Sequence, residues 1–184
     1  MTGAVFLRGD RVTLRTVERD DVEFVHREKN KPEVHRSFVW PYPETRDDVE
    51  EYLLDGDGTK LLVWAADAEG DPERVGQVGL GVDDERTRHG DLGVWIAEPY
   101  WGEGYGTEAC ERLVAYAFAE RNLHRVTARV VEGNEGSKRI WETLGFEHEG
   151  VHRDAEFVNG AYRDVHVYGV LADEWRERDV GPDR

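Results

Sequence analysis

Three glycines alternate along a short stretch of the chain, at Gly102, Gly104 and Gly106. They follow an apolar segment that predicts a strand and precede apolar residues at helical spacing, so they lie in a turn that opens a helix. Such a turn presents backbone N–H groups together with the positive end of the helix dipole. The stretch therefore predicts a site for a phosphate-bearing ligand. The residues expected to form it are Trp101, Gly102, Glu103, Gly104, Tyr105, Gly106 and Thr107.

This pattern differs from two other glycine-rich phosphate loops. A loop of the NTPase kind carries Lys and then Ser or Thr after its last glycine, whereas Thr107 and Glu108 follow Gly106 here. A dinucleotide fingerprint has the spacing G-x-G-x-x-G near the start of a βαβ unit, which this chain lacks. A tight turn that binds no ligand is the alternative interpretation.

A second pattern lies about thirty residues further on, in the segment 134–146. Asn134 suits the N-cap of a helix and Gly145 suits the residue after its end, so they bracket a helix of about three turns. Ser137 falls on the apolar stripe of that helix, one turn before Trp141. A hydroxyl on this face needs a partner, which is either a ligand or the backbone of the helix itself.

The two motifs, W-G-E-G-Y-G-T-E-A from Trp101 and N-x-x-S-x-R-x-W-x-x-L-G-F from Asn134, resemble those of the GNAT superfamily of acetyl-coenzyme A-dependent N-acetyltransferases. The loop 40–43 and the segment 155–160 are similar to the RimJ/RimL-like branch, which modifies ribosomal protein N-termini or related amines. The resemblance spans nearly the whole chain. It implies an α/β (α+β) fold with a mixed, strongly twisted central sheet of about seven strands, about four helices, and two central parallel strands that splay apart.

The resemblance also implies acetyl-coenzyme A (acetyl-CoA) as the acyl donor, with its pantetheine arm between the strands expected at 90–97 and 125–131. Main-chain groups of Val94, Trp95 and Ile96 are expected to pair with the amides of that arm. The family usually has Gln or Arg where this chain has Trp101, so Lys138 or Arg139 becomes the candidate for a cation near the pyrophosphate. The expected cofactor site is completed by Asn134, Lys138 and Trp141.

Acyl transfer to an amine requires a base for the ammonium proton, donors for the oxyanion and a donor for the departing thiolate. Many GNAT enzymes place a Tyr where this chain has Trp141, so Ser137 is expected to donate to the sulfur instead. Glu156 is expected to be the base, acting through a water, with Asp164 in reserve. The alternative for Glu156 is a solvated carboxylate on a hairpin.

The acceptor is the part of the reaction that the sequence resolves least. Phe38, Trp40 and Tyr42 predict an aromatic wall on the acceptor side, and a loop packed over the core is the alternative. A protein N-terminal α-amine is the leading acceptor. A small amine such as a polyamine or an aminoglycoside is the second, and a non-catalytic CoA-binding sensor, favoured by Trp141 in place of Tyr, is the third.

The composition is strongly acidic, with a formal net charge of −16 over 184 residues. Such a chain repels phosphate backbones and anionic lipids, so neither nucleic acid nor a membrane is expected as a partner. The acidity resembles that of proteins from salt-rich cytoplasm, although attraction of a cationic substrate is the alternative. There is no stretch of 18 apolar residues and no signal-like N-terminus, so we expect a cytoplasmic monomer or homodimer. No pair of histidines has metal-site spacing, and Cys110 is expected in the core.

The remaining pattern predicts one domain over residues 1–184 with a frayed tail from residue 175. A strand at 12–15 precedes a helix at 20–29, and Thr45 with Asp48 caps a second helix. Strands at 61–66 and 75–82 form a hairpin. Two final strands flank Asn159-Gly160, which is a strong hairpin turn signal.

Overall fold

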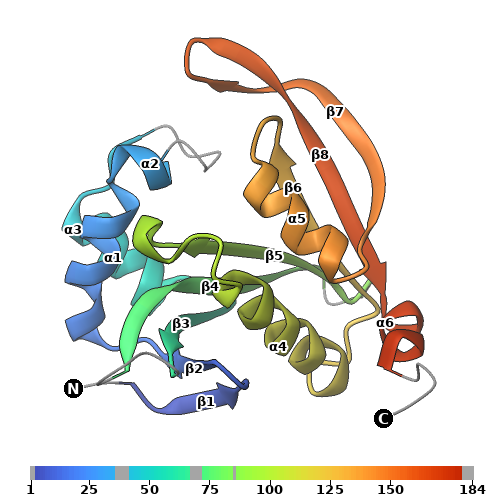
Figure 1. Ribbon diagram of the computed structural model, residues 1–184, viewed down its shortest axis with the longest axis horizontal. Helices are drawn as coiled ribbons and strands as arrows, with labels where there is room; N and C mark the ends of the chain where they lie inside the picture. The colour runs from blue at the N-terminus through green and yellow to red at the C-terminus, as the bar shows by residue number, and fades with distance from the viewer. Residues whose placement is uncertain (1–2, 36–41, 67–71, 85, 180–184) are drawn as a thin grey trace.

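A computed structural model describes residues 3–35, 42–66, 72–84 and 86–179. Within these residues one eight-stranded sheet has the order β1-β2-β3-β4-β5-β6-β8-β7 (Figure 1). Neighbouring strands are antiparallel except β5 and β6, which are parallel. The strands are β1 (Val5–Arg8), β2 (Val12–Thr16), β3 (Thr59–Ala65), β4 (Glu73–Asp84), β5 (His89–Ile96), β6 (Arg125–Val131), β7 (Glu147–Val158) and β8 (Ala161–Leu171).

Helices cover both faces of this sheet. The α-helices are α1 (Val22–Lys29), α2 (Pro32–His35), α3 (Arg46–Glu50), α4 (Tyr105–Ala119), α5 (Glu135–Thr143) and α6 (Ala172–Asp179). Short turns of other helix types are η1 (Arg19–Asp21), η2 (Glu51–Asp55) and η3 (Glu98–Tyr100). The mixed fold implied by the resemblance is confirmed, and the short elements β1 and α2 account for part of the difference from the expected counts. Among the described residues, no helix is long and apolar enough to cross a membrane.

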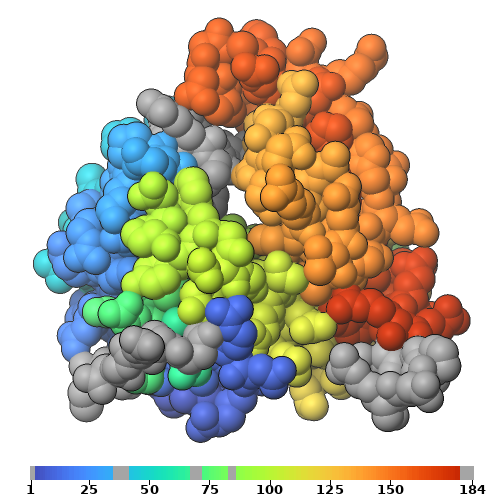
Figure 2. Space-filling view, in the orientation of Figure 1, coloured from blue at the N-terminus to red at the C-terminus, as the bar shows by residue number. Residues whose placement is uncertain are grey.

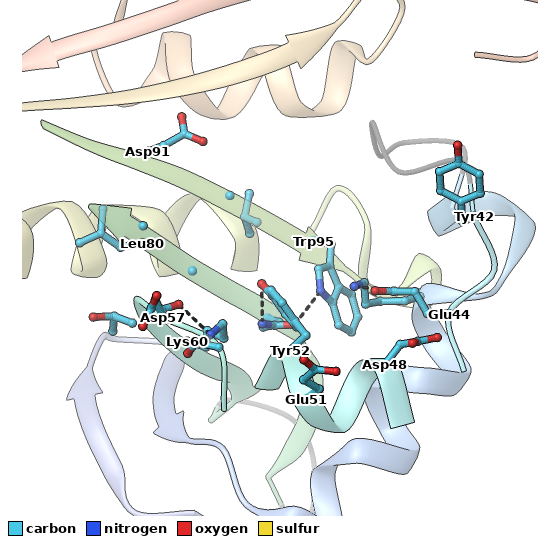
Figure 3. Close-up of a pocket in the computed structure, with 18 of the residues that line it drawn as sticks. Tyr42, Glu44, Asp48, Glu51, Tyr52, Asp57, Lys60, Leu80, Asp91 and Trp95 are labelled. Atoms are coloured by element: carbon cyan, nitrogen blue, oxygen red, sulfur yellow. Dashed lines mark hydrogen bonds and ion pairs between the residues drawn. The ribbon is translucent and has the colours of Figure 1, made fainter. Parts of the chain in front are cut away.

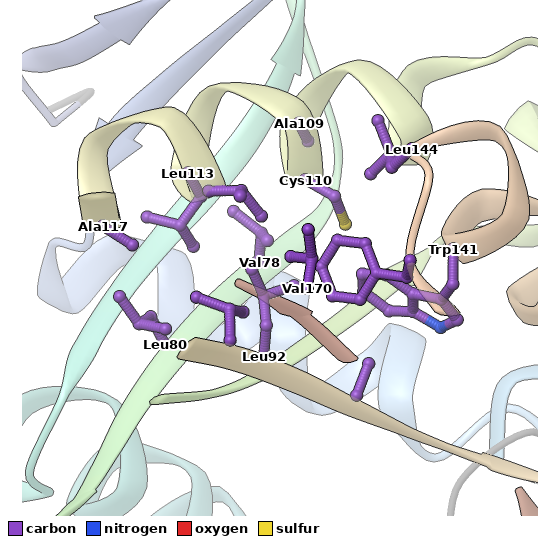
Figure 4. Packing of buried hydrophobic residues seen from close by; sticks show 14 of the residues in the cluster. Val78, Leu80, Leu92, Ala109, Cys110, Leu113, Ala117, Trp141, Leu144 and Val170 are labelled. Atoms are coloured by element: carbon purple, nitrogen blue, oxygen red, sulfur yellow. The ribbon is translucent and has the colours of Figure 1, made fainter. Parts of the chain in front are cut away.

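The alternation of side chains along β3 explains why the sheet has two separate cores. Leu61 and Val63 point into a large core beneath α4, whereas Leu62 and Trp64 point into a smaller core beneath α1 and α3. Figure 4 shows the large core, where Leu113 and Ala117 of α4 lie over strand residues that include Leu80. Cys110 belongs to this core, as expected, and its burial raises the pKa of its thiol. The cysteine is therefore a packing residue.

The parallel strands β5 and β6 pair over a short stretch only. Their register runs from His89↔Arg125 to Asp91↔Thr127 and then stops. Beyond that point β5 continues along β4 to Ile96, and β6 continues along β8 to Val131. The two strands therefore diverge, as the resemblance implied, and Figure 1 shows β6 turning away from β5. We call the space between residues 92–96 and 128–131 the wedge.

The C-terminal segment differs from the sequence expectation, because α6 continues past residue 175 to Asp179. Trp175 is buried against Phe118 of α4. Arg178 forms an ion pair with Glu111 at 2.9 Å and donates a hydrogen bond to the carbonyl oxygen of Leu144. These contacts join α6 to α4 and α5, which the polar sequence of the tail gave no reason to expect.

Candidate active site

The glycine stretch forms a loop that turns directly into α4. Gly102 and Gly104 have φ angles of +79° and +87°, in the left-handed region that side chains disfavour. Gly104 is the N-cap of α4, so the loop ends where the helix dipole is most positive. The first turn of a helix has amides with no intrahelical acceptor, and here these belong to residues 104–107. The backbone thus has the shape and polarity expected of a phosphate cradle.

The side chains of this stretch have structural tasks. Tyr105 is buried in the large core and stands edge-on to Tyr100. A Cβ on Gly106 would lie 3.2 Å from Ile140 of α5 and 3.3 Å from Ile96 of β5, so this glycine allows close packing of three elements. Trp101 is half-exposed and donates its indole N–H to the carbonyl oxygen of Ile96 at 2.6 Å. The loop therefore offers a ligand mainly its backbone.

Arg11 brings a cation to the glycine loop, although sequence reasoning did not identify it. Its guanidinium donates to the carbonyl oxygen of Glu103 at 2.7 Å and lies 4.9 Å from the centre of the Tyr105 ring. Its backbone N–H donates to Glu108 at 2.9 Å, as that of Val12 does at 3.4 Å. The motif glutamate Glu108 therefore ties α4 to the turn between β1 and β2. No feature of the sequence around residue 11 predicts this contact.

The two cations proposed from the sequence lie on α5. Lys138 forms an ion pair with Glu142 one turn later, at 3.8 Å. Arg139 is exposed on the same helix. The described residues show Arg11 in contact with the loop, and a place for Lys138 or Arg139 near a pyrophosphate stays a prediction.

Only alternate residues of β5 direct their main-chain groups into the wedge. Ala97 donates its N–H to Val75 of β4 at 2.8 Å, so Trp95, two residues earlier, also directs its polar main-chain groups toward β4. Val94 and Ile96 face the wedge instead, and the Ile96 oxygen already accepts from Trp101. Trp95 thus differs from the expectation: its side chain is buried in the smaller core and its main chain belongs to the ladder with β4.

The expected cap of α5 is present, and the helix orients Ser137. Asn134 accepts a hydrogen bond from the backbone N–H of Ser137 at 3.1 Å. Trp141 is almost fully buried and donates its indole N–H to the hydroxyl oxygen of Ser137 at 3.1 Å. Because the serine oxygen accepts this bond, its own hydrogen is available to donate elsewhere. Trp141 therefore contacts Ser137 directly, whereas the sequence analysis had assigned it to the cofactor.

On the opposite face of the sheet from α4, the described residues enclose a cavity of about 950 Å³. We call it the acidic cavity, because the charged residues that line it in the described part of the chain are Glu44, Asp48, Glu51, Asp57 and Asp91 against Lys29 and Lys60. Figure 3 shows these side chains around Tyr52 and Trp95. Figure 2 shows the other face, where the molecule is hollowed between the yellow-green residues that lead into α4 and the orange α5. A positive ligand fits the lining of the acidic cavity.

Glycines form the floor of the acidic cavity. On this face Gln77 lies opposite Trp95, Gly79 opposite Gly93, and Gly81 opposite Asp91. A Cβ on Gly93 would meet no atom within 4 Å, and none of these glycines has a positive φ angle. Backbone conformation therefore does not require glycine at these positions. Their effect is to keep the cavity open beside the wedge.

A polar network that starts from the buried side chains of Trp95 and Gln77 holds Tyr52 over this floor. Trp95 donates to Gln77 at 3.1 Å, and the amide of Gln77 donates to the Tyr52 hydroxyl at 3.4 Å. Tyr52 lies in η2, where the helical hydrogen-bond pattern widens to that of a π-helix, a feature frequent at functional sites. Burial raises the pKa of the Tyr52 hydroxyl above the ordinary value for tyrosine.

The two lysines flank the Tyr52 ring, each with its nitrogen 4.9 Å from the ring centre. Lys29 forms an ion pair with Glu44 at 2.6 Å, and Lys60 donates to the carbonyl oxygen of Asp57 at 2.8 Å. Burial lowers the pKa of Lys60. Both ammonium groups thus lie against the ring face and oxygen atoms, which are the groups that a cationic amine contacts favourably, although burial disfavours the charge of Lys60.

The carboxylates proposed as bases lie on the final hairpin, whose Asn159-Gly160 turn is present as predicted. Glu156 pairs with Arg129 of β6 at 3.7 Å and is not among the residues lining the acidic cavity. Asp164 accepts from the backbone N–H of Asp154 at 2.9 Å and supports the irregular part of β7. The carboxylate that the fold brings to the meeting point of β5 and β6 is Asp91, which the sequence analysis did not single out.

The expected aromatic wall is only partly described. Phe38 and Trp40 lie outside the described residues. Tyr42 lines the acidic cavity and is 63% exposed, so it is not packed into the core. Among the described residues, His, Cys, Asp and Glu side chains form no group of three that could hold a metal ion.

Comparison with known proteins gives this geometry a context. The profile of the family described as "Acetyltransferase (GNAT) domain" matches residues 11–147. A putative ribosomal N-acetyltransferase of Bacillus subtilis, YdaF, is 39% identical over 105 residues, so the alignment spans 57% of each protein. The spermidine N(1)-acetyltransferase of Escherichia coli K12 is 31% identical over 158 residues, which cover 84% of this chain and 82% of that protein.

A solved structure extends the likeness to nearly the whole chain. The spermidine N-acetyltransferase from Vibrio cholerae, in complex with CoA and spermine, aligns with a TM-score of 0.81 at 26% identity. The alignment covers 91% of this chain and 99% of that one. The resemblance to the RimJ/RimL-like branch is confirmed by the ribosomal relative, and spermidine acetyltransferases match as well. Since the family profile covers most of the sequence, this chain belongs to the GNAT family of acetyltransferases.

Proposed function

We propose that this protein transfers an acetyl group from acetyl-CoA to a primary amine, and that the acceptor is a small cationic amine of the polyamine kind. The observation that supports this acceptor most is the acidic cavity, where five carboxylates outnumber two lysines among the described residues of the lining. A protonated amine is attracted to such a surface, and aromatic faces add to the attraction. The spermidine acetyltransferases among the relatives support the same choice.

The residues of the donor site fit CoA. The glycine loop ends at the N-terminus of α4, and a side chain on Gly102 or Gly104 would be strained at their positive φ angles. We infer that the amides of this loop hold the diphosphate, with Arg11 keeping the loop in place. Val94, which faces the wedge, pairs with the amides of the pantetheine arm. Acetyl-CoA supplies an activated thioester. The residues of the protein position the two reactants and transfer the protons.

Two side chains have proposed chemical roles. Ser137 donates its hydroxyl hydrogen to the departing sulfur, and Trp141 orients it by donating to its oxygen. Glu156 is the base proposed from the sequence. If Glu156 is the base, the proton reaches it through a water, and Arg129 balances the charge of its carboxylate. The carboxylates that line the acidic cavity hold the acceptor there.

A protein N-terminal α-amine is the second candidate acceptor, and it was the leading one from the sequence alone. The ribosomal relative favours it. We rank it second because a cavity lined by so many carboxylates suits an acceptor with several positive charges, whereas most protein N-termini carry one. A third possibility is a sensor that binds CoA without turnover.

Acetylation assays separate these possibilities. The purified protein is given acetyl-CoA with spermidine, an aminoglycoside, or a peptide that carries a ribosomal protein N-terminus. Turnover of spermidine with little turnover of the peptide supports the proposal, and the reverse preference would establish the second candidate. Calorimetry with CoA tests the third candidate, because a protein that binds CoA but acetylates none of the three acceptors would be a sensor. A ligand at 100 times its Kd adds about 2.7 kcal/mol to stability, so thermal unfolding provides an independent check.

A further inference from the structure

Three hydrogen-bonded polar side chains connect β5 to β6 at the last residues that these strands pair. The hydroxyl oxygen of Thr127 lies 3.2 Å from a carboxylate oxygen of Asp91 and 2.9 Å from Nε2 of His89. It also lies 3.4 Å from the carbonyl oxygen of Gly90, and Thr127 is only 6% exposed. A hydroxyl has one hydrogen to donate and can accept from other donors, so Thr127 can connect the two titratable groups.

Asp91 occupies the narrow end of the wedge. It pairs with Thr127 in the last register position that β5 and β6 share, and the unpaired edge of β5 begins at the next residue. It also lies opposite Gly81 on the floor of the acidic cavity and lines that cavity (Figure 3). Asp91 is thus the carboxylate that borders both spaces: the wedge proposed for the donor and the cavity proposed for the acceptor.

His89 is the member of this hydrogen-bonded group that lies nearest to solvent. It lies at the start of β5 and is only partly buried, whereas Thr127 between it and Asp91 is buried. Protons move readily along hydrogen-bonded groups that can each accept and donate. The three side chains therefore form a path from the reaction space toward solvent.

We propose that Asp91 accepts the proton of the acceptor ammonium group, and that Thr127 and His89 return it to solvent. This inference rests on the proposed acetyl transfer. An N–H bond of the ammonium breaks, the proton passes across one water to a carboxylate oxygen of Asp91, and the nitrogen keeps the electron pair with which it attacks. Afterwards Asp91 gives its proton to the Thr127 oxygen while the Thr127 hydroxyl gives its own to Nε2 of His89, in the tautomer whose Nε2 is unprotonated.

The other proposed base is placed less favourably. Glu156 faces Arg129 at 3.7 Å and does not line the acidic cavity, whereas Asp91 does. The charged side chains that share the cavity with Asp91 are Lys29, Glu44, Asp48, Glu51, Asp57 and Lys60. Of these carboxylates, Asp57 is a matched control, because it lines the same cavity but has no contact with Thr127.

The first experiment compares Asp91→Asn, Glu156→Gln and Asp57→Asn with the wild type, using spermidine as acceptor. An amide cannot take the proton, so Asp91→Asn is expected to lower kcat about a hundredfold, with the Kd for CoA changed less than about twofold and the KM for spermidine raised no more than in Asp57→Asn. Asp57→Asn is expected to change KM and leave kcat unaltered. A normal kcat for Asp91→Asn, or a loss confined to Glu156→Gln, would overturn the assignment.

The second experiment tests the proton directly with ethylamine and 2,2,2-trifluoroethylamine, two acceptors of similar size. The fluorinated amine is already neutral at the assay pH, so it needs no base before attack. Asp91→Asn is expected to lose far more activity with ethylamine than with the fluorinated amine. Equal losses with both would mean that Asp91 acts in folding or binding, and the proposal would be wrong.

The relay has its own variants, which remain informative if Asp91→Asn folds poorly. Thr127→Val removes the hydroxyl, and Thr127→Ser restores it without the methyl group. The valine variant is expected to lower kcat about tenfold and the serine variant to recover most of it, with thermal unfolding confirming that both fold. Equal rates for the two variants would reject the relay. A wild type that acetylates no amine would instead refute the proposed function itself, which distinguishes the two failures.

Discussion

The donor side and the acceptor side of the candidate site are built in different ways. The proposed donor site consists of the glycine loop with the first turn of α4, the edge of β5 and the first turn of α5. Its groups are mostly backbone amides, and each part is a continuous stretch of sequence. The acidic cavity on the acceptor side gathers side chains from α1, the segment 42–60, β4 and β5. None of these groups belongs to a compact motif.

This difference explains what each side can specify. A diphosphate looks the same in every CoA, so a cradle of backbone amides can be encoded by glycines and a helix start. An amine acceptor is recognised by charge, length and ring contacts, which depend on side chains held at particular positions. We therefore expect substitutions on the donor side to affect every acceptor equally, and substitutions in the acidic cavity to change the preference among acceptors.

The largest expected effect is on the donor side, at the N-cap of α4. Gly104→Val places a branched side chain at a φ angle of +87° and in the path of the diphosphate. Calorimetry should show CoA affinity reduced about a hundredfold, because the side chain obstructs the approach of the phosphates and the strained loop moves away from the shape of the cradle. Gly145→Val is the matched control, since Gly145 has a φ angle of +74° at the far end of α5. Normal affinity in Gly104→Val would refute the cradle.

A smaller effect is expected for Ser137→Ala, which removes the donor proposed for the sulfur. A hydrogen bond to a charged group contributes about 1.5–3 kcal/mol, so kcat should fall about thirtyfold while the Kd for CoA stays nearly constant. The loss should be equal for all acceptors, since the thiolate is common to all. Trp141→Phe, which leaves the hydroxyl but removes its indole partner, should reduce kcat less. An unchanged kcat in Ser137→Ala would eliminate its proposed role.

On the acceptor side, Gly93→Val should block the floor of the acidic cavity without disturbing the fold. A Cβ there meets no atom within 4 Å, and a branched residue suits a strand. The KM for the acceptor should rise about tenfold, more for bulky amines than for slender ones, with unchanged CoA affinity and no loss in Tm. Gly150→Val in β7 is the control, because a Cβ at Gly150 also meets nothing within 4 Å. If both variants behave alike, the glycine floor does not select acceptors.

The smallest effect is expected for Arg11→Ala, which releases the glycine loop without altering its backbone. One largely exposed hydrogen bond to Glu103 is lost, so CoA affinity should fall about threefold. Arg8→Ala removes a nearby exposed arginine of β1 and should leave affinity unchanged. Equal affinities in the two variants would show that Arg11 contributes only to packing.

The local elements could be predicted from the sequence because their signals lie within a few residues of one another. Asn134 caps α5, Thr45 and Asp48 form the capping box of α3, and Asn159-Gly160 makes the hairpin turn. The glycine loop and its helix followed from the same kind of signal. Strand bounds were within about two residues for β3 and β4, although the short elements β1 and α2 were missed, because four-residue segments carry too little periodicity.

The sequence by itself determined the two motifs, and through them the family and the donor side, because backbone conformation and helix caps depend on neighbouring residues. Only the tertiary structure decided which distant residues meet. Arg11 reaches a loop 92 residues away, the indole of Trp141 donates to Ser137, and the register of β5 and β6 places Asp91 beside Thr127. Such contacts follow from strand order and register, which no short segment of the chain encodes.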